Sequence, residues 1–489
     1  MKTDRRKNLF FSLSCSIATG IILSFAFPPS ATWQIAFLAM IPLLISAGED
    51  SWRNLLSGIT AGFVFYVIVL SWLYNVAGPI YLLLALYLSV YWGVFLYLVF
   101  ALPEKGRIFT AAFVWCLLEI IMSGLLTGFP WLLLGVSQWQ NGRILKIAGL
   151  CGTYGISFVI VLVNLTVFYA FRKRYVVSFF VSAIVLIGIC FLPGQAVYHR
   201  ISSTGSLNIM VIQPDIDASI EENPYTTLKV VEAVMFENME KDRQPDIVIW
   251  PEGSFPDNID KYPDVLDGLK TLCKENDFRL ILGTFTGTEK AVYNSSLLVG
   301  GDSIQVYRKN RLVPYGEFIL GGRCRVIRNI YEKIAEYIPV TIPGRELTLF
   351  TLGGNKKIAP LICFENVFPD MAGGYVREGG ELFVVITNDS WFGRSAGPCQ
   401  HFAHNALRAA ETGRYFVQGS LSGISGVVSP AGVVENTIRQ NGEELFVKGA
   451  LYAAVPLVCG ETFYSQTGDI PLFILSVIFT GVILCRHRR

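Results

Sequence analysis

Hydrophobic runs long enough to cross a lipid bilayer are the feature that most constrains this chain of 489 residues. A transmembrane helix needs about 20 predominantly apolar residues. Charged residues make up only 16% of the chain, against about a quarter in soluble proteins. The sequence therefore predicts an integral membrane protein with about eight transmembrane helices, the second of them short and interrupted. The expected spans are residues 9–27, 33–48, 55–73, 80–102, 108–127, 147–171, 175–193 and 468–485.

The balance of charge and the use of cysteine exclude several classes of protein. The chain has 40 Lys and Arg residues against 38 Asp and Glu, so it has no basic field that would attract nucleic acid. Its 10 cysteines are too few and too scattered for a disulfide scaffold, and no pair has metal-ligand spacing. We therefore expect no metal, no cofactor and no nucleic-acid partner. The sequence leaves open whether four thiols pair with one another: Cys273, Cys324, Cys399 and Cys459.

The distribution of Lys and Arg between the runs predicts the orientation of the chain, because positive loops stay in the cytoplasm. Alternate loops carry these residues, and the intervening loops are nearly bare, with Arg143 and Lys146 as the exceptions. The alternation holds only with eight spans. It places both termini in the cytoplasm and residues 195–467 on the other side. A cleaved signal peptide is less favoured, because the first run is long and no A-x-A site follows it. The residues that carry this argument are Lys2, Arg5, Arg6, Lys7, Arg53, Lys105, Arg107, Arg172, Lys173, Arg174, Arg486, Arg488 and Arg489.

Residues 195–467 are predicted to form a separate α/β domain. Short β-branched runs alternate there with helical patterns, and strands that are nearly continuous apolar runs are covered on both faces. This favours a layered domain with at least two sheets. We expect a transmembrane domain at 1–194 with seven helices, the α/β domain at 195–467, and a C-terminal helix with its tail at 468–489. The expected strands are 207–214, 246–252, 279–285, 292–299, 303–309, 358–365, 382–389 and 415–420, and the expected helices are 225–241, 260–276, 370–379 and 399–413.

Three reactive side chains stand at the ends of predicted strands, namely Glu252, Lys309 and Cys363. Each alone is more often structural, since a strand-end Glu or Lys is commonly a solvated turn residue and a Cys is commonly part of the core. Together they meet a chemical need, because a cysteine nucleophile requires a base and a positive neighbour. Glu252 could take the thiol proton, and Lys309 could stabilise the thiolate and an oxyanion. The set predicts acyl transfer through a thioester.

Four motifs of this domain resemble the successive signatures of the carbon–nitrogen hydrolase (nitrilase) superfamily. The apolar runs, the GFPW stretch and the segment 390–402 are similar to the apolipoprotein N-acyltransferase branch of that superfamily. The resemblance covers essentially the whole chain. The four motifs are WPEGSFP (250–256), YRKNRLVPYGE (307–317), LICFENVFP (361–369) and TNDSWFG (387–393), and the GFPW stretch occupies 128–131.

This resemblance implies an αββα sandwich that faces the periplasm and is anchored in the inner membrane of a bacterium. Such an enzyme would take an acyl chain from a membrane phospholipid onto Cys363. It would then pass the chain to the α-amino group of the diacylglyceryl-cysteine of an apolipoprotein. We expect the protein to act as a monomer.

The resemblance also implies a role for individual residues. Glu252 matches the general base, Lys309 the oxyanion lysine and Cys363 the nucleophile of the family. The remaining implied residues support the site: Glu317 as a second glutamate, the backbone N–H of Phe364 as an oxyanion donor, and Glu365, Asn388 and Asp389 as residues that hold the site in place.

The chain departs from the family pattern in three places. The family usually reads Thr or Ser and then Ala where this chain has Gly253-Ser254, and Tyr in place of Phe364. These two changes are mild. The third is larger, because Gln418 and Leu421 stand where the family tends to have Arg and Asn. The sequence leaves open whether this change alters the acceptor or the activity.

Several alternatives remain. A membrane-tethered amidase or nitrilase acting on a small molecule, or a degenerate member of the family with an altered acceptor, would keep the same three residues. A transporter or scaffold would explain the apolar runs but not the reactive set. His401 and His404 lie one helical turn apart and could bind a metal or serve Cys363 as a base, although no third metal ligand stands near them. In the fifth apolar run, Glu119 is expected to be a neutral or hydrogen-bonded buried group. After that run, Trp131 is expected to be an anchor at the membrane interface or part of a lipid-facing mouth.

Overall fold

The computed structural model describes most of the chain. Among the residues used to predict the orientation, Lys105, Lys173, Arg174, Arg488 and Arg489 lie outside the described residues. The described ranges are 2–102, 106–172, 176–216, 223–240, 242–289, 291–300, 303–322, 324–325, 328–329 and 341–486.

Contacts divide the chain into two compact units. A helical unit comprises Met1–His199, Ser395–Glu411 and Thr462–Arg489, and an α/β unit comprises Arg200–Arg394 and Thr412–Glu461. Both boundaries lie a few residues from the expected ones, and the larger difference is helix α15 (Gly397–Thr412), which packs with the helical unit. The side chain of Gln400 explains the difference. Its Oε1 accepts hydrogen bonds from the indole N–H of Trp72 at 3.0 Å and of Trp131 at 2.9 Å.

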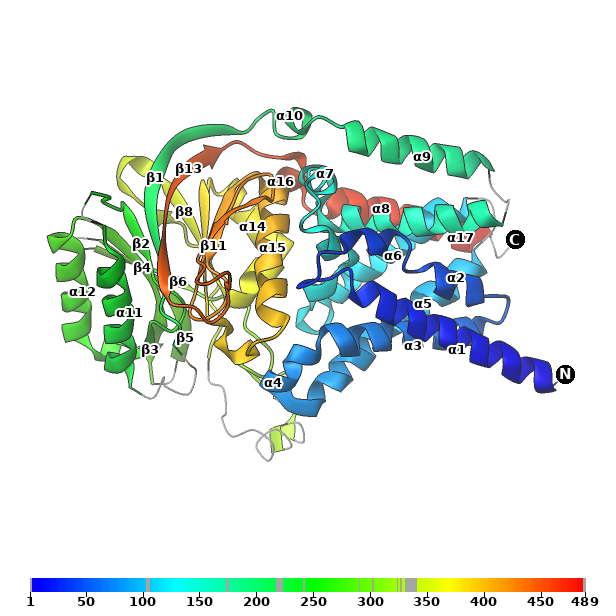
Figure 1. The fold of residues 1–489 in the computed structure, drawn as a ribbon, viewed down its shortest axis with the longest axis horizontal. Helices are drawn as coiled ribbons and strands as arrows, with labels where there is room; N and C mark the ends of the chain where they lie inside the picture. Colours follow the sequence, from blue (N-terminus) through cyan, green and yellow to red (C-terminus); the bar gives the residue numbers. More distant parts are fainter. Residues whose placement is uncertain are drawn as a thin grey trace. The chain divides into compact units, whose positions relative to one another are not determined.

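The helical unit contains an apolar helix at each of the eight expected spans (Figure 1). Four helical segments are long and apolar enough to cross a membrane, namely Ser51–Val69, Ser71–Ala101, Arg107–Thr127 and Ala148–Phe171. Shorter apolar helices lie within Leu9–Ser24, Trp33–Ser46, Phe180–Ile189 and Ile470–Gly481, so the count of eight spans is not confirmed. The α-helices of this unit are α1 (Lys2–Ser24), α2 (Ile41–Ser46), α3 (Ser51–Val69), α4 (Tyr74–Ala77), α5 (Tyr81–Ala101), α6 (Arg107–Gly124), α7 (Gly142–Leu145), α8 (Ala148–Phe171), α9 (Val176–Phe191), α10 (Gly194–Val197), α15, α16 (Phe463–Thr467) and α17 (Ile470–Arg486), and its 3-10 turns are η1 (Trp33–Phe37), η2 (Ser71–Leu73), η3 (Gly78–Ile80), η4 (Leu125–Thr127), η5 (Pro130–Leu132) and η6 (Leu134–Gln138).

The short second run is a broken helix whose free backbone groups are bonded to neighbouring side chains. Asn164 of α8 accepts a hydrogen bond from the Met40 N–H at 3.0 Å and donates one to the Ala36 carbonyl at 2.9 Å. The hydroxyl of Thr19 accepts from the Leu43 N–H at 3.0 Å. Because lipid offers no hydrogen bonds, an interrupted backbone at membrane depth needs partners from the protein itself. The interruption visible in the sequence is therefore a break that is buried within the helical unit.

Helices α3 and α5 pack closely because glycines face one another across their contact. A Cβ atom added to Gly58 would overlap the Trp92 carbonyl oxygen and lie 2.7 Å from the Gly93 Cα. A Cβ atom on Gly93 would lie 2.9 Å from the Leu55 carbonyl oxygen. Neither position has room for a side chain. Small residues of this kind let the backbones of two membrane helices approach each other.

The α/β unit is built on two sheets that stack face to face. The first has the order β13-β1-β2-β4-β5-β6, with β3 also paired to β4, and the second has the order β12-β11-β10-β9-β8-β7. Gly419 of β10 marks the contact between them, since its Cβ would lie 3.1 Å from Ile249 of β2. The eight expected strands are all present, and the structure adds β3, β7, β11, β12 and β13. The strands are β1 (Ser202–Gln213), β2 (Ile247–Ile249), β3 (Phe255–Asn258), β4 (Arg279–Thr288), β5 (Ala291–Gly300), β6 (Ser303–Arg308), β7 (Phe350–Thr351), β8 (Lys357–Ile362), β9 (Leu382–Thr387), β10 (Tyr415–Ser420), β11 (Gly426–Val428), β12 (Val434–Thr437) and β13 (Gly449–Cys459).

Helices cover the outer face of each sheet. Figure 1 shows α11 (Pro224–Asn238) and α12 (Pro263–Glu275) side by side on the first sheet, where Val231 and Leu269 join a buried cluster with Val248. On the second sheet, Tyr375 of α14 (Pro369–Arg377) packs its ring 6.0 Å from that of Phe383 in β9. The unit therefore has the helix, sheet, sheet, helix layering that the resemblance implies. Its remaining turns are η8 (Ile259–Lys261), η9 (Gly353–Asn355), η10 (Cys363–Val367) and η11 (Asp389–Phe392).

The close contact of α3 and α5 generates a prediction. Gly58→Ala should destabilise the helical unit by about 1–3 kcal/mol, because the new methyl group must push the two helices apart. Gly188→Ala is the matched control, since no atom lies within 4 Å of the Cβ position there. Thermal unfolding of the detergent-solubilised protein measures both effects. Equal melting temperatures for the two variants would contradict the prediction.

Candidate active site

Cys363 stands at the corner where β8 ends and η10 begins. Its φ of 52° lies in the left-handed region, which costs a residue other than glycine about 1–2 kcal/mol. Such a conformation persists only where the surroundings hold it. The carboxylate of Glu365 supplies one restraint, since its Oε2 accepts the N–H of Ile362, the last residue of β8, at 2.9 Å. The prediction that Cys363 stands at the end of a strand is confirmed.

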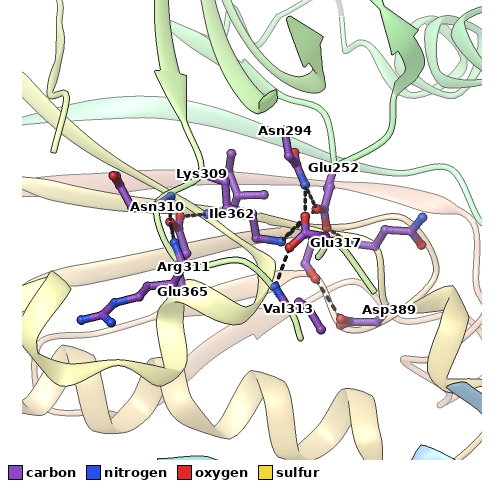
Figure 2. Close-up of polar contacts among 12 residues, drawn as sticks. Glu252, Asn294, Lys309, Asn310, Arg311, Val313, Glu317, Ile362, Glu365 and Asp389 are labelled. Atoms are coloured by element: carbon purple, nitrogen blue, oxygen red, sulfur yellow. Dashed lines mark hydrogen bonds and ion pairs between the residues drawn. The ribbon is translucent and has the colours of Figure 1, made fainter. Parts of the chain in front are cut away.

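Glu365 joins this corner to the segment that follows β6. Its other oxygen, Oε1, accepts the backbone N–H groups of Asn310 at 2.6 Å and Arg311 at 3.1 Å (Figure 2). The same oxygen accepts the hydroxyl of Tyr307 at 2.8 Å. The side chain is completely buried, and burial raises the pKa of Glu365 to about 7 although the N–H and O–H donors oppose the shift. Glu365 therefore fixes the position of Cys363 relative to the segment after Lys309.

Lys309 follows β6 and is buried between two carboxylates. Its Nζ donates to Glu317 Oε1 at 3.0 Å and lies 3.6 Å from Glu252 Oε1, while the residue is only 1% exposed. Burial alone would lower the pKa of Lys309, but the charges of Glu317 and Glu252 outweigh it and raise the pKa. Lys309 is therefore an ammonium ion at neutral pH. It can donate hydrogen bonds to an oxyanion but cannot accept a proton.

Asn294 of β5 is a site residue that the sequence analysis missed. Its Nδ2 donates to Glu252 Oε1 and to Glu317 Oε1, both at 2.8 Å (Figure 2). The neighbouring strand places it there, because the Lys309 N–H donates to the Asn294 carbonyl at 2.8 Å. The available signal was an amide side chain inside a strand predicted at 292–299, where a buried polar residue must have partners.

The second oxygen of each carboxylate is bonded to a backbone N–H. Glu252 Oε2 accepts from Asn388 at 2.9 Å, and Glu317 Oε2 accepts from Val313 at 2.7 Å. Asn388 follows β9 and caps η11, where its Oδ1 accepts the N–H of Ser390 at 3.2 Å. Asn388 therefore contacts Glu252 through its backbone, and its side chain serves the local turn.

Cys363 is electrostatically coupled to the same groups. Burial raises the pKa of Cys363, the charge of Glu252 raises it further, and the charge of Lys309 only partly opposes this. The resting residue is therefore a thiol and needs a base to become a nucleophile. The arrangement can supply this chemistry, because Glu252 can accept the proton and Lys309 can donate to an oxyanion.

Asp389 is buried beside the ends of β9 and β10. Its Oδ1 accepts the hydroxyl of Thr387 at 2.8 Å, and its Oδ2 lies 3.4 Å from the hydroxyl of Ser420. A Cβ atom on Gly423 would lie 2.7 Å from the Asp389 Cβ, so the loop after β10 packs directly against this side chain. These contacts link the loop after β9 to the loop after β10.

Gln418 and Leu421, the two residues of the third departure from the family pattern, lie inside the α/β unit. Gln418 is fully buried, and its Nε2 donates to the Ile424 carbonyl at 2.9 Å. Leu421 is also fully buried and belongs to the apolar cluster that includes Met210 and Trp250. Its N–H donates to the Thr387 carbonyl at 3.0 Å. The departures therefore change internal packing rather than an open polar contact.

Trp131 and the two histidines lie in the helical unit. The ring of His401 stacks on Trp131 with centroids 5.4 Å apart, and a ring nitrogen of His404 lies 3.1 Å from the Trp131 carbonyl. Trp131 is only 2% exposed, so the prediction of an interfacial anchor is wrong. The indole is buried because the Gln400 amide accepts its N–H. Glu119 is buried and accepts the Leu134 N–H at 2.8 Å, as expected of a hydrogen-bonded group.

Comparison with known families agrees with this geometry. Residues 209–458, more than half of the chain, match the family model described as "Carbon-nitrogen hydrolase". The chain belongs to the carbon–nitrogen hydrolase family. Residues 19–166 match a second model, described as "Apolipoprotein N-acyltransferase N-terminal domain". This carbon–nitrogen hydrolase therefore carries an additional helical region ahead of its α/β unit.

Curated relatives share both regions. The "Apolipoprotein N-acyltransferase" of Geobacter metallireducens is 29% identical, and the match covers 93% of this chain and 91% of that protein. The protein of the same name from Shewanella oneidensis is 28% identical, with 93% and 92% covered. Among solved structures, an amidase from Nesterenkonia sp. is 16% identical and covers 56% of this chain and 98% of its own, with a TM-score of 0.39. That score is too low to add to the assignment.

The burial of Leu421 predicts the effect of restoring the residue typical of the family. Leu421→Asn should lower the free energy of unfolding by about 2–4 kcal/mol, because it places an amide in an apolar cluster. Val433→Asn at a position that is 52% exposed is the control. Thermal unfolding should show a lower melting temperature for the first variant only. A Leu421→Asn protein as stable as the wild type would contradict the assignment of this residue to the core.

The raised pKa of Glu365 predicts how stability depends on pH. The folded protein binds this proton more tightly than the unfolded chain, since the pKa is about 7 against an ordinary value of 4.5. The stability that Glu365 contributes is therefore complete below about pH 4.5 and is lost as the pH rises through about 7. Glu365→Gln cannot ionise, so its melting temperature should fall less over this range than that of the wild type. Glu443→Gln, an exposed control, should keep the wild-type dependence.

Proposed function

We propose that this carbon–nitrogen hydrolase transfers an acyl chain from a membrane phospholipid to the N-terminal amino group of the diacylglyceryl-cysteine of apolipoproteins. The observation that carries this proposal is the presence of both family regions, in order, on one chain. An α/β unit with a buried amine beside a partly buried thiol and two partly buried carboxylates suits acyl transfer, and four apolar helices suit substrates that are held in a bilayer. Relatives named apolipoprotein N-acyltransferase match 93% of the chain.

In the first half-reaction, Cys363 attacks the ester carbonyl of the phospholipid. The sulfur forms a bond to the carbonyl carbon, and the thiol proton passes to Glu252. The ammonium of Lys309 and the backbone N–H of Phe364 stabilise the oxyanion. The tetrahedral intermediate then expels the alkoxide of the lysophospholipid. This alkoxide takes the proton from Glu252, and a thioester remains on the enzyme.

In the second half-reaction, the amino group of the lipoprotein attacks the thioester. Glu252 removes a proton from the incoming ammonium, an amide bond forms, and the Cys363 thiol is released. Water must be excluded from the thioester, because hydrolysis would end the cycle without transfer. Trp391 in η11 is an apolar side chain that is 55% exposed and could contact an acyl chain. Glu317, Glu365 and Asn388 hold the reacting groups in place.

The same proposal includes a topology in the inner membrane of a bacterium. Eight spans would place both termini in the cytoplasm and the α/β unit in the periplasm, where lipoproteins mature. The positive loops support this orientation. A single copy of the chain supplies every site residue named above, so a monomer is sufficient for the reaction.

The first test is mass spectrometry of the protein after incubation with phospholipid. The wild type should gain one acyl group on Cys363 that hydroxylamine removes, because a thioester is cleaved by this nucleophile. Cys363→Ala should gain none, while Cys273→Ala, which removes a buried thiol with no assigned role, should still be acylated. If the wild-type protein is folded and never acquires the adduct, the proposed acyltransferase activity is refuted.

The acceptor is tested by adding a diacylglyceryl-cysteine peptide to the acylated enzyme. Loss of the adduct together with formation of an N-acyl peptide supports the proposed function. Discharge to water or to a small amine, but not to the lipopeptide, would favour the amidase or the family member with an altered acceptor.

A further inference from the structure

The groups around Lys309 form a closed ring in which donors and acceptors alternate. Glu252 Oε1 and Glu317 Oε1 each lie between the same two nitrogen atoms (Figure 2). Asn294 Nδ2 is 2.8 Å from both oxygens, and Lys309 Nζ is 3.6 Å from the first and 3.0 Å from the second. Two donors, one charged and one neutral, therefore share two anionic acceptors.

The neutral donor, the Asn294 amide, stabilises two carboxylates that would otherwise repel each other. Two carboxylates beside one ammonium leave a net negative charge in a buried site, and like charges favour protonation of one carboxyl group. Hydrogen bonds to the charged form oppose that protonation. The carboxamide of Asn294 offers one N–H to each carboxylate and adds no charge. An aspartate in place of Asn294 would offer the two glutamate carboxylates no hydrogen-bond donor and would add a third negative charge.

The ring is not symmetric, and its asymmetry separates the two carboxylates. Glu317 has the shorter contact with Lys309, at 3.0 Å, and a backbone N–H at 2.7 Å. Glu252 has the longer contact, at 3.6 Å, and a backbone N–H at 2.9 Å. Glu317 is therefore paired more closely with Lys309 and with its backbone donor. Glu252 has the looser ion pair and depends more on the Asn294 amide.

We propose that Asn294 is a positioning residue that holds the Glu252 carboxylate in place as the base for Cys363, acting through the ring with Glu317 and Lys309. This inference rests on the proposed function for the role of Glu252. The pairing of the sheet does not depend on the Asn294 side chain. Strand β5 pairs with β4 and β6 through backbone groups, which substitution by Asp or Ala keeps.

Alkylation of Cys363 by iodoacetamide tests the proposal without any lipid substrate. The sulfur–carbon bond forms, iodide leaves, and the thiol proton passes to Glu252. The rate is measured on the full-length protein in detergent across the pH range in which carboxylates and thiols titrate, with peptide mass spectrometry to assign the modified residue. The variants are Asn294→Asp, which keeps the size, and Asn294→Ala, which removes the amide. Asn436→Asp on exposed β12 is the matched control, and Glu252→Gln removes the base.

Wild-type reactivity should fall on the acid side as Glu252 is protonated. The midpoint of this fall should move up by about one pH unit or more in Asn294→Asp, because a like charge replaces a donor. It should move up by a smaller amount in Asn294→Ala and stay unchanged in Asn436→Asp. Glu252→Gln should abolish the part of the fall that lies in the carboxylate range and leave only the dependence on ionisation of the thiol itself. A role limited to folding would lower the melting temperature of both Asn294 variants and leave the midpoint where it is.

Two results would overturn the proposal. One is an unshifted midpoint in folded Asn294→Asp or Asn294→Ala, and the other is a fall in the carboxylate range that persists in Glu252→Gln. Failure of the proposed function looks different. In that case no thioester forms from phospholipid, but the alkylation midpoints of the Asn294 variants still move.

Discussion

A lysine ammonium that is 1% exposed can persist only where opposite charges surround it, and the α/β unit is arranged around this requirement. Lys309 follows β6, Glu252 follows β2, and Glu317 lies in the segment after Lys309. Each of these groups would be costly if buried alone. Their mutual pairing makes the burial of all three tolerable. Burial and the charge of Glu252 together raise the pKa of Cys363, so this residue stays protonated in the resting protein. The charges that stabilise the buried site therefore set its chemistry as well.

Much of this arrangement can be predicted from the sequence, because strand ends carry a local signal. Continuous apolar runs identify β1, β8 and β9, and the motifs that follow strands identify Glu252, Lys309 and Cys363. Asn294 gave a weaker signal, since it lies in the middle of a strand and its role depends on two glutamates that are distant in sequence. The backbone conformation of Cys363 gave no signal, because it follows from tertiary restraints such as those from Glu365.

The helical unit shows a different limit of sequence reasoning. Hydropathy locates its helices, but it does not say how polar groups within them are used. Asn164 bonds to the backbone of the broken second run, and Gln400 accepts the indole N–H groups of Trp72 and Trp131. The burial of Trp131 depends on a partner that lies far away in the sequence. For the same reason, a boundary drawn from composition does not assign α15 to the helical unit.

The left-handed conformation of Cys363 has a consequence for how this protein can change over time. Glycine is the residue best suited to a φ of 52°, yet glycine has no thiol. The fold therefore gives up stability at the one position where the proposed reaction needs a sulfur atom. A lineage that lost the activity would gain stability by replacing this cysteine with glycine. At this position the requirement for a thiol and the requirement for an unstrained backbone therefore oppose each other.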